Sequence, residues 1–213
     1  MSSDVLVTTP AQRQTEPHAE AVSRNRRQQA TFRKVLAAAM ATLREKSYAD
    51  LTVRLVAARA KVAPATAYTY FSSKNHLIAE VYLDLVRQVP CVTDVNVPMP
   101  IRVTSSLRHL ALVVADEPEI GAACTAALLD GGADPAVRAV RDRIGAEIHR
   151  RITSAIGPGA DPDTVFALEM AFFGALVQAG SGTFTYHEIA DRLGYVVGLI
   201  LAGANEPSTG GSE

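Results

Sequence analysis

Residues 52–71, TVRLVAARAKVAPATAYTYF, constrain the fold of this chain more than any other segment. Thr52 is a good N-cap, and the apolar residues that follow recur at the spacing of one helix face, which predicts a short helix. Residues 60–63 separate it from a second short helix that begins at Pro64, because proline suits the first helical position. The spacing predicts a helix-turn-helix.

The apolar residues of this segment give the two short helices a consistent inner side. Val56 and Ala60 are expected to pack inward, and Val62 to fill the turn. Ala67 and Phe71 lie one helical turn apart, beneath the second helix. The polar side chains of the second helix are therefore left on the outer surface.

The rest of the chain also predicts helices. Alanine, a strong helix former, occupies 35 of 213 positions, and no segment keeps the period-two alternation of a strand. Asp134-Pro135 and Asp161-Pro162 each pair an N-cap carboxylate with a proline at the first helical position. We expect an all-α chain of about nine helices: 26–46, one from Thr52, one from Pro64, 74–89, 101–115, 119–129, 135–156, 162–180 and 186–203.

The charge of the chain is unevenly distributed although the total is −1. Residues 1–90 carry 13 basic and 7 acidic side chains, whereas residues 91–213 carry 8 and 15. Residues 24–74 alone hold eleven Lys and Arg against Glu45 and Asp50, a net charge of +9. Such asymmetry points to a polyanionic partner, either nucleic acid or an anionic membrane.

Several classes of protein are excluded by composition. A hydrophobic content of 48% is too high for a disordered chain, and two cysteines without a CxxC motif exclude a disulfide framework and a cysteine-built zinc site. No apolar run reaches the length of a membrane span. Residues 1–23 lack a signal-peptide pattern and are expected to form a disordered arm of a cytoplasmic protein, with a flexible tail at 205–213.

The outward side chains of the second short helix suit a nucleic acid. Hydroxyl groups and a lysine are partners for phosphate oxygens, and short side chains let the helix approach a groove closely. Thr66, Tyr68, Thr69, Tyr70 and Lys74 form this set. Arg26 and Arg27, near the start of the first helix, add further candidate contacts to phosphates or to a minor groove.

The run RKVLAAAMATLREKSYADLTVRLVAARAKVAPATAYTYFSSKNHL, residues 33–77, resembles the N-terminal domain of TetR/AcrR-family transcriptional regulators. The resemblance rests on a threonine before the second helix and on the pattern T-x-Y-x-(Y/H)-F-x-x-K. It implies phosphate contacts at Thr52, Thr66, Tyr68, Tyr70 and Lys74, and positions facing base edges at Pro64, Ala65 and Thr69.

The chain departs from that family pattern in the turn and at the second short helix. Lys61 stands where a turn glycine is usual, so it must tolerate the turn backbone, and it adds a positive charge near the DNA. Ser47 replaces a frequent glycine, and Ala63 and Ala65 stand where serine and glycine are usual. Ala63 weakens the N-cap, which Pro64 partly offsets.

The last two long helices carry rows of small residues. Residues 162–180 are apolar around the whole helix axis, which indicates burial on all sides. Small residues at four-residue spacing permit close helix approach. The resemblance implies that both helices pair with those of a second subunit in a four-helix bundle, and the predicted interface residues are Ala171, Ala175, Ala179, Ala190, Gly194 and Gly198.

Residues of an effector pocket are harder to identify in the acidic C-terminal part. His109, Cys124, Phe166, Met170 and Phe173 are candidates for lining a cavity, with core packing as the alternative for each. The five histidines show no metal-ligand spacing, and neither a GxSxG motif nor a glycine-rich phosphate loop occurs. We therefore expect no catalytic activity, no cofactor and no metal.

Together these features predict a homodimeric, ligand-responsive transcriptional regulator, with repression as the expected mode. Its domains would be 24–75 for binding a palindromic DNA operator and 76–204 for dimerisation and for binding a hydrophobic small molecule. Two alternatives remain open: a nucleoid-type DNA-binding protein without ligand control, and an all-α enzyme. Sequence-independent binding with a steep salt dependence would favour the first of these.

Overall fold

The computed structural model describes residues 17–204, and the side chains of residues 25–204. Within that range the chain forms nine α-helices and two 3₁₀ turns and has no strand, which confirms the predicted all-α class. None of these helices combines the length and the apolar character needed to cross a membrane. The elements are α1 Pro17–Leu43, α2 Val53–Arg59, α3 Pro64–Tyr70, α4 Lys74–Gln88, α5 Met99–Ala111, η1 Leu112–Val114, α6 Pro118–Asp130, η2 Gly131–Ala133, α7 Pro135–Ile156, α8 Pro162–Gly180 and α9 Tyr186–Ala204.

The two Asp-Pro pairs begin helices as predicted. Asp134 accepts a hydrogen bond from the Ala136 amide at 2.9 Å, and α7 starts at the next residue, Pro135. Asp161 accepts one from the Thr164 amide at 2.8 Å, ahead of α8. Each carboxylate thus satisfies a backbone donor that the first helical turn leaves free.

The first helix is longer than its sequence pattern indicated. It begins at Pro17 rather than Arg26, so residues 17–23 are helical and the prediction of a disordered arm is wrong for them. Pro17 occupies the first helical position, and residues 18–31 contain neither glycine nor proline, so nothing interrupts the helix before the apolar face begins. Residues 1–16 and the predicted tail 205–213 lie outside the described residues.

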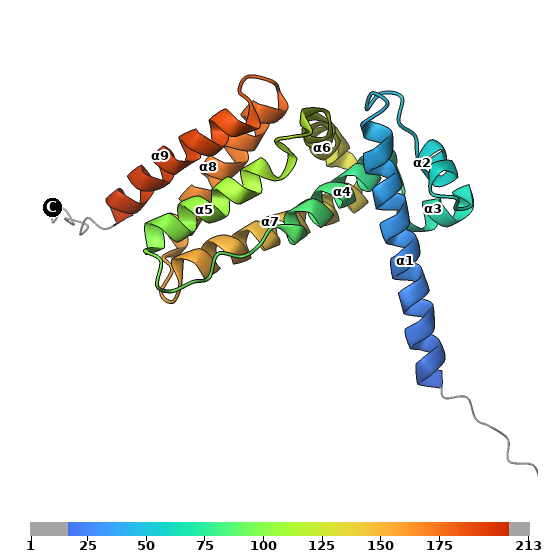
Figure 1. The fold of residues 1–213 in the computed structure, drawn as a ribbon, viewed down its shortest axis with the longest axis horizontal. Coiled ribbons are helices and arrows are strands. Elements are labelled where there is room, and N and C mark those ends of the chain that lie inside the picture. The colour runs from blue at the N-terminus through green and yellow to red at the C-terminus, as the bar shows by residue number, and fades with distance from the viewer. Residues whose placement is uncertain (1–16, 205–213) are drawn as a thin grey trace, which may run out of the picture.

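The helices form a head and a larger body (Figure 1). The head consists of α1, α2 and α3. The N-terminal half of α1 extends beyond the other helices. The body holds α5 to α9, with α9 at the far side from the head. Helix α4 leads from the head into the body, where it packs against α6 and α7.

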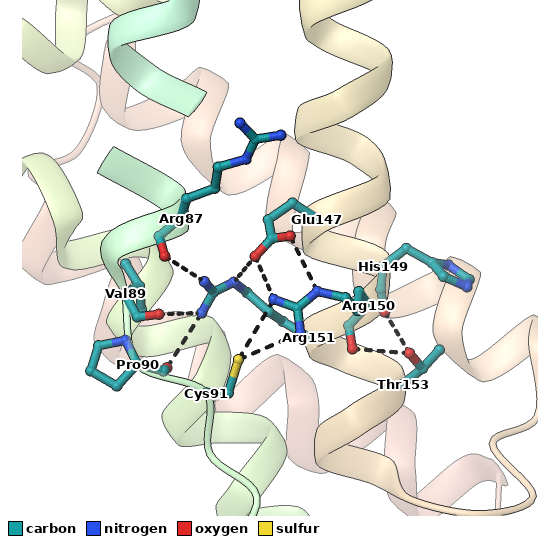
Figure 2. A network of polar contacts seen from close by, with 9 residues as sticks. All are labelled: Arg87, Val89, Pro90, Cys91, Glu147, His149, Arg150, Arg151 and Thr153. Atoms are coloured by element: carbon teal, nitrogen blue, oxygen red, sulfur yellow. Dashed lines mark hydrogen bonds and ion pairs between the residues drawn. The ribbon is translucent and has the colours of Figure 1, made fainter. Parts of the chain in front are cut away.

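Helices α4 and α7 run parallel and are joined at their starts and near their ends. At the starts, Ser73 Oγ donates to Asp134 Oδ2 at 2.9 Å. Near the ends, the buried Arg151 guanidinium donates to the carbonyls of Val89, at 2.6 Å, and Arg87, at 3.3 Å. Figure 2 shows this guanidinium reaching from α7 to the last turn of α4.

Two carboxylates support the contact between α4 and α7, one by holding Arg151 within α7 and one by a direct ion pair. Glu147 accepts from Arg151 Nε at 3.0 Å and from Arg150, so the buried Arg151 has an ionic partner as well as carbonyl partners. In the middle of α4, the buried Glu80 forms an ion pair with Arg143 of α7. The two helices are therefore connected by polar bonds along the whole of their contact.

Candidate nucleic-acid interface and internal cavity

The connection between α2 and α3 has a tight backbone with a left-handed residue. Thr52 Oγ1 accepts from the Leu55 amide at 3.1 Å, so the predicted N-cap of α2 is present. Lys61 has a φ of 54°, in the region that glycine adopts without strain and lysine rarely occupies. The Val62 amide then donates to the Ala57 carbonyl at 2.9 Å, which closes the turn. The substitution of lysine for the usual glycine therefore leaves the turn intact at a conformational cost.

Helix α3 begins at Pro64 and is held from beneath. Its N-cap, Ala63, makes no side-chain hydrogen bond, as its residue type predicted. Ala67 and Phe71 are fully buried and Val62 is partly buried against the core, which confirms the predicted inner side of the helix-turn-helix. The position of α3 thus depends on apolar packing rather than on a polar cap.

Five of the eleven residues predicted to contact DNA lie on the outer surface of α3. Pro64, Ala65, Thr66, Tyr68 and Thr69 are all exposed. The Thr69 hydroxyl donates to the Ala65 carbonyl at 3.0 Å, and this leaves its oxygen free to accept a further hydrogen bond. A contact of these residues with bases or phosphates remains a prediction.

Tyr70 differs from the predicted contacts on the outer surface of α3 because it is half-buried. Its ring meets the ring of Phe32 from α1 edge to face, with centroids 6.1 Å apart. Phe32 in turn stacks on Phe71 at 5.1 Å. Tyr70 therefore contributes to the packing that fixes α3 against α1.

Lys74 is partly engaged within the head. Its Nζ donates to the Tyr48 carbonyl at 3.1 Å and reaches the Ala49 carbonyl at 3.5 Å, and it lies 4.4 Å from the centroid of the Tyr48 ring. An ammonium group has three donors, so one remains for a phosphate. Lys74 thus holds the loop between α1 and α2 at the same time as it is available to an anion.

Basic side chains surround α3 on the head. Arg26 and Arg27, together with Arg33 and Lys34, are exposed on α1, and Lys61 is exposed in the turn. Arg59, by contrast, is paired with Glu45 through two contacts of 2.6 Å. Among the described residues, the unpaired positive charges of the head therefore include those on α1, in the turn and at the exposed Arg54 of α2.

The body contains a cavity of about 710 Å³. Its walls come from α4, α6, α7 and α8, with Tyr186 of α9. Cys124 and Phe173, two of the five predicted pocket residues, lie on these walls. The prediction is wrong for His109, Phe166 and Met170, which do not line the cavity. His109 is exposed on α5, and Phe166 and Met170 are 62% and 56% exposed on α8.

The cavity has a buried end without charged side chains. Tyr82, Cys124 and Tyr186 lie there, each at most 5% exposed. Burial raises the pKa of the Cys124 thiol to about 12, so the thiol is neutral, and burial also raises the pKa of Tyr82 above its ordinary value. Gly121 lets the Tyr186 ring lie close to α6, because a Cβ at residue 121 would lie 2.4 Å from the Tyr186 oxygen.

Charged side chains occupy the outer part of the cavity wall. Arg141, Asp142 and His149 of α7 are exposed, and Glu169 of α8 is half-buried. His149 Nδ1 lies 2.8 Å from Glu169 Oε1, so these two groups are partners across the opening between α7 and α8. The cavity is thus apolar and neutral inside and charged at its mouth.

The predicted small-residue rows of α8 and α9 face partly inward. Ala179 and Ala190 are 6% and 1% exposed, and a Cβ on Gly194 would lie 3.4 Å from Thr104 of α5. The prediction that these three form an exposed interface is wrong, because a four-residue spacing drifts around a helix and carries the rows against α5 and α6. Ala171 and Ala175 are half-buried and Gly198 is exposed.

Several large apolar side chains are exposed on α8 and α9 instead. Phe166, Met170 and Val177 on α8 and Leu199 on α9 are each 46% exposed or more. On α8 these residues are spaced four and seven apart, so they lie along one side of the helix. The expectation that α8 is buried all round is therefore not met within one subunit.

Sequence reasoning missed the residues that connect α4 to α7. Ser73, Glu80 and Arg151 contact partners 61 to 64 positions away, and no local pattern identifies such pairs. It also missed Tyr82, whose place on α4 resembles that of any core aromatic residue. The Asp134-Pro135 signal was recognised only as a helix start, whereas Asp134 also bonds to Ser73.

A family model described as bacterial regulatory proteins of the tetR family matches residues 35–81. The match covers α2 and α3 and parts of α1 and α4.

Solved structures of such regulators share the fold of the described chain. A TetR transcriptional regulator from Rhodococcus sp. RHA1 is 21% identical, with a TM-score of 0.70 over 84% of this chain and 98% of that one. FadR from Thermus thermophilus, a TetR-family repressor in complex with lauroyl-CoA, is 18% identical, with a TM-score of 0.60 over 85% and 99%. FadR from Bacillus subtilis, in complex with stearoyl-CoA, is 14% identical, with a TM-score of 0.54 over 81% and 98%.

Proposed function

We propose that this chain is a TetR-family transcriptional regulator, and that it acts as a homodimeric repressor that an apolar small molecule releases from a palindromic operator. The observation that carries the proposal is the double role of α7. This helix lines the cavity, and it is bonded at both ends to α4, which continues from the head. A ligand that displaces α7 would therefore also displace α4 and the head.

The outer surface of α3 is the proposed reading surface. We propose that Thr52, Thr66, Tyr68, Tyr70 and Lys74 contact phosphates, that Pro64, Ala65 and Thr69 face base edges, and that Arg26, Arg27 and Lys61 add charge. Hydroxyls that position the helix and short side chains near the bases agree with how a helix-turn-helix divides these tasks.

The outer face of α8 and α9 supports the proposed dimer. Phe166, Met170, Val177 and Leu199 are large apolar side chains exposed on these two helices. Large apolar side chains exposed on neighbouring helices are what a protein interface would cover. A two-fold dimer would present two α3 helices to half-sites about 34–36 Å apart.

The cavity supports an apolar effector. A volume of about 710 Å³ suits a ligand of drug or lipid size. The two FadR proteins were solved with acyl-CoA ligands, so the same fold accommodates long hydrocarbon chains in those relatives. We propose that this protein acts by binding, with an allosteric coupling of about 1–3 kcal/mol between cavity and DNA, rather than by turnover.

A gel-shift titration on the DNA upstream of the protein's own gene tests the reading surface. Tyr68→Phe and Lys74→Ala should weaken binding broadly, by about two- to tenfold each, because each removes a phosphate contact. Thr69→Ala should also change base preference at one position of the site. Ser154→Ala, which removes an exposed hydroxyl near the end of α7, is the control and should leave the affinity unchanged.

The same titration separates the proposal from its rival. A footprint with two-fold symmetry is expected from a dimer that reads an operator. Binding without a defined footprint, with a steep salt dependence and no effect of Thr69→Ala, would favour a nucleoid-type protein instead.

A further inference from the structure

We propose that the effector is an apolar molecule bearing one uncharged oxygen that accepts a hydrogen bond from the Tyr82 hydroxyl at the buried end of the cavity. This inference rests on the proposed function of the cavity and specifies the chemistry of its ligand. It is carried by the state of the Tyr82 hydroxyl and by the groups that surround it.

The Tyr82 hydroxyl lacks a hydrogen-bond partner. Among side chains within the described part of the chain, its oxygen is the buried polar atom left without one. The residue is 5% exposed and lies on the cavity wall. A buried hydroxyl without a partner is costly, so native structures nearly always supply one from the protein, from water or from a ligand. An oxygen atom on the effector would satisfy it.

The neighbouring polar groups do not fulfil this role. The Cys124 thiol lies 4.0 Å from the Ile78 carbonyl and is only a weak donor and acceptor. The Tyr186 hydroxyl interacts with the Thr125 side chain, whose own hydroxyl donates to the Gly121 carbonyl at 3.1 Å. Tyr82 is thus the available donor at this end of the cavity.

The absence of charge around Tyr82 selects an uncharged ligand group. The charged wall residues Arg141, Asp142 and His149 are exposed at the mouth, and Glu169 is already partnered by His149. An ionised carboxylate or ammonium brought to the buried end would lose its hydration without gaining a counter-charge, which is strongly unfavourable. A ketone, ester or lactone oxygen accepts a phenolic hydrogen bond without that penalty.

The middle of the cavity suits the rest of such a molecule. Leu128, Ile144, Phe173 and Leu176 supply apolar surface between the buried end and the mouth. The hydrocarbon part of the ligand would lie against these side chains, with its oxygen at the buried end of the cavity.

The test uses four probes with the same hydrocarbon body and different ends. They are 6-phenylhexan-2-one, hexylbenzene, 6-phenylhexanoate and 6-phenylhexylamine, and each competes with the neutral fluorescent probe N-phenyl-1-naphthylamine for the full-length protein. Tyr82→Phe keeps the shape of the ring and removes only the hydroxyl. It should weaken ketone binding by about two- to tenfold, the range of one net hydrogen bond, and leave hexylbenzene binding unchanged or stronger. The carboxylate and the amine should bind more weakly than the ketone.

The controls separate this inference from the function on which it rests. Tyr195→Phe carries the same substitution outside the cavity and should preserve the wild-type order of the four probes. If Tyr82→Phe weakens the ketone and hexylbenzene equally, or if an ionised probe binds best, the inference is overturned while the cavity keeps its proposed role. A wild-type protein that binds neither the fluorescent probe nor any of the four ligands would overturn both.

Discussion

Ser73 and Asp134 are the N-caps of two different helices, and they are bonded to each other. Ser73 Oγ accepts from the His76 amide at 3.1 Å and donates to Asp134 Oδ2 at 2.9 Å, while Asp134 Oδ1 accepts from the Ala136 amide at 2.9 Å. The Ala136 amide and the Ser73 hydroxyl together hold the pKa of Asp134 below its ordinary value. The first turns of α4 and α7 therefore share one hydrogen-bond network.

A double-mutant cycle should detect this bond as a coupling energy. Ser73→Ala and Asp134→Ala each remove an N-cap, which costs about 1 kcal/mol. Because the two residues also bond to each other, their effects on the free energy of unfolding should differ from additivity by about 0.5–1.5 kcal/mol in a urea titration. Asp161→Ala is the matched control, since Asp161 also caps a helix before a proline but bonds to Thr164 of its own helix. A cycle of Ser73→Ala with Asp161→Ala should be additive. Equal coupling in both cycles would contradict a direct bond.

Tyr82→Phe should stabilise the protein in the absence of ligand. The substitution removes a buried hydroxyl that has no partner, and the cost of leaving such a group unsatisfied is about 1–3 kcal/mol. The free energy of unfolding should therefore rise by about 1 kcal/mol, with a higher Tm in thermal melting. Tyr186→Phe offers a contrast, because the Tyr186 hydroxyl interacts with Thr125, and its loss should lower the stability. A lower Tm for Tyr82→Phe would show that its hydroxyl is already satisfied.

Lys61→Gly should separate the backbone cost of the turn from the charge that lysine supplies. A left-handed backbone costs a lysine about 1–2 kcal/mol, and glycine removes this cost. Part of the gain is lost because glycine gives the unfolded chain greater conformational freedom. The net expectation is a rise of up to about 1 kcal/mol in the free energy of unfolding. DNA affinity should fall, and its dependence on salt should become shallower, because one cation is lost. Lys61→Asn, which tolerates the same backbone, should reproduce the weaker DNA binding. If the salt dependence of DNA binding is unchanged in both variants, Lys61 does not contact the DNA.

Glu80 should make the stability of the protein depend on pH in the acidic range. Burial raises its pKa, but hydrogen bonds from His76 and Arg143 outweigh burial and hold the pKa below its ordinary value of 4.5. A carboxyl whose pKa is lowered by folding stabilises the folded state above that ordinary value and loses the contribution as the pH falls through the folded pKa.

Glu80→Gln should therefore lower the free energy of unfolding by about 1–3 kcal/mol at pH 7 and by less at pH 3. Urea titrations at several pH values would measure the difference. Glu119→Gln, on the exposed side of α6, should shift the curve little at any pH. A constant difference between wild type and Glu80→Gln from pH 7 to pH 3 would contradict the ionic role of Glu80.

Features encoded by neighbouring residues were predictable from the sequence. Thr52, Pro64, Asp134 and Asp161 mark helix starts because the capping interaction involves residues only two or three positions apart. The inner side of the helix-turn-helix was predictable for the same reason, since its packing follows from helical spacing within one short segment. Lys61 was correctly identified as strained by comparison with the glycine that usually stands there.

Features that depend on the packing of distant helices were not predictable. Residues 162–180 are apolar around the helix, so the sequence does not distinguish Phe173, which lines the cavity, from Phe166, which is exposed and does not line it. Ala190 and Gly194 have the residue types of a close helix contact, but only the structure identifies α5 as the neighbour within the subunit. The unpartnered state of Tyr82 likewise depends on what surrounds it in three dimensions.

The bonds at both ends of α4 and α7 determine which parts of the molecule can deform. Two parallel helices joined at their starts by Ser73 and Asp134 and near their ends by Arg151 cannot easily slide or splay relative to each other. The two helices are therefore expected to move together as one rigid unit. Movement would then occur where this unit contacts the other helices. A small rotation of α4 and α7 at the cavity would displace α3 by a larger distance, because displacement grows with distance from the axis of rotation.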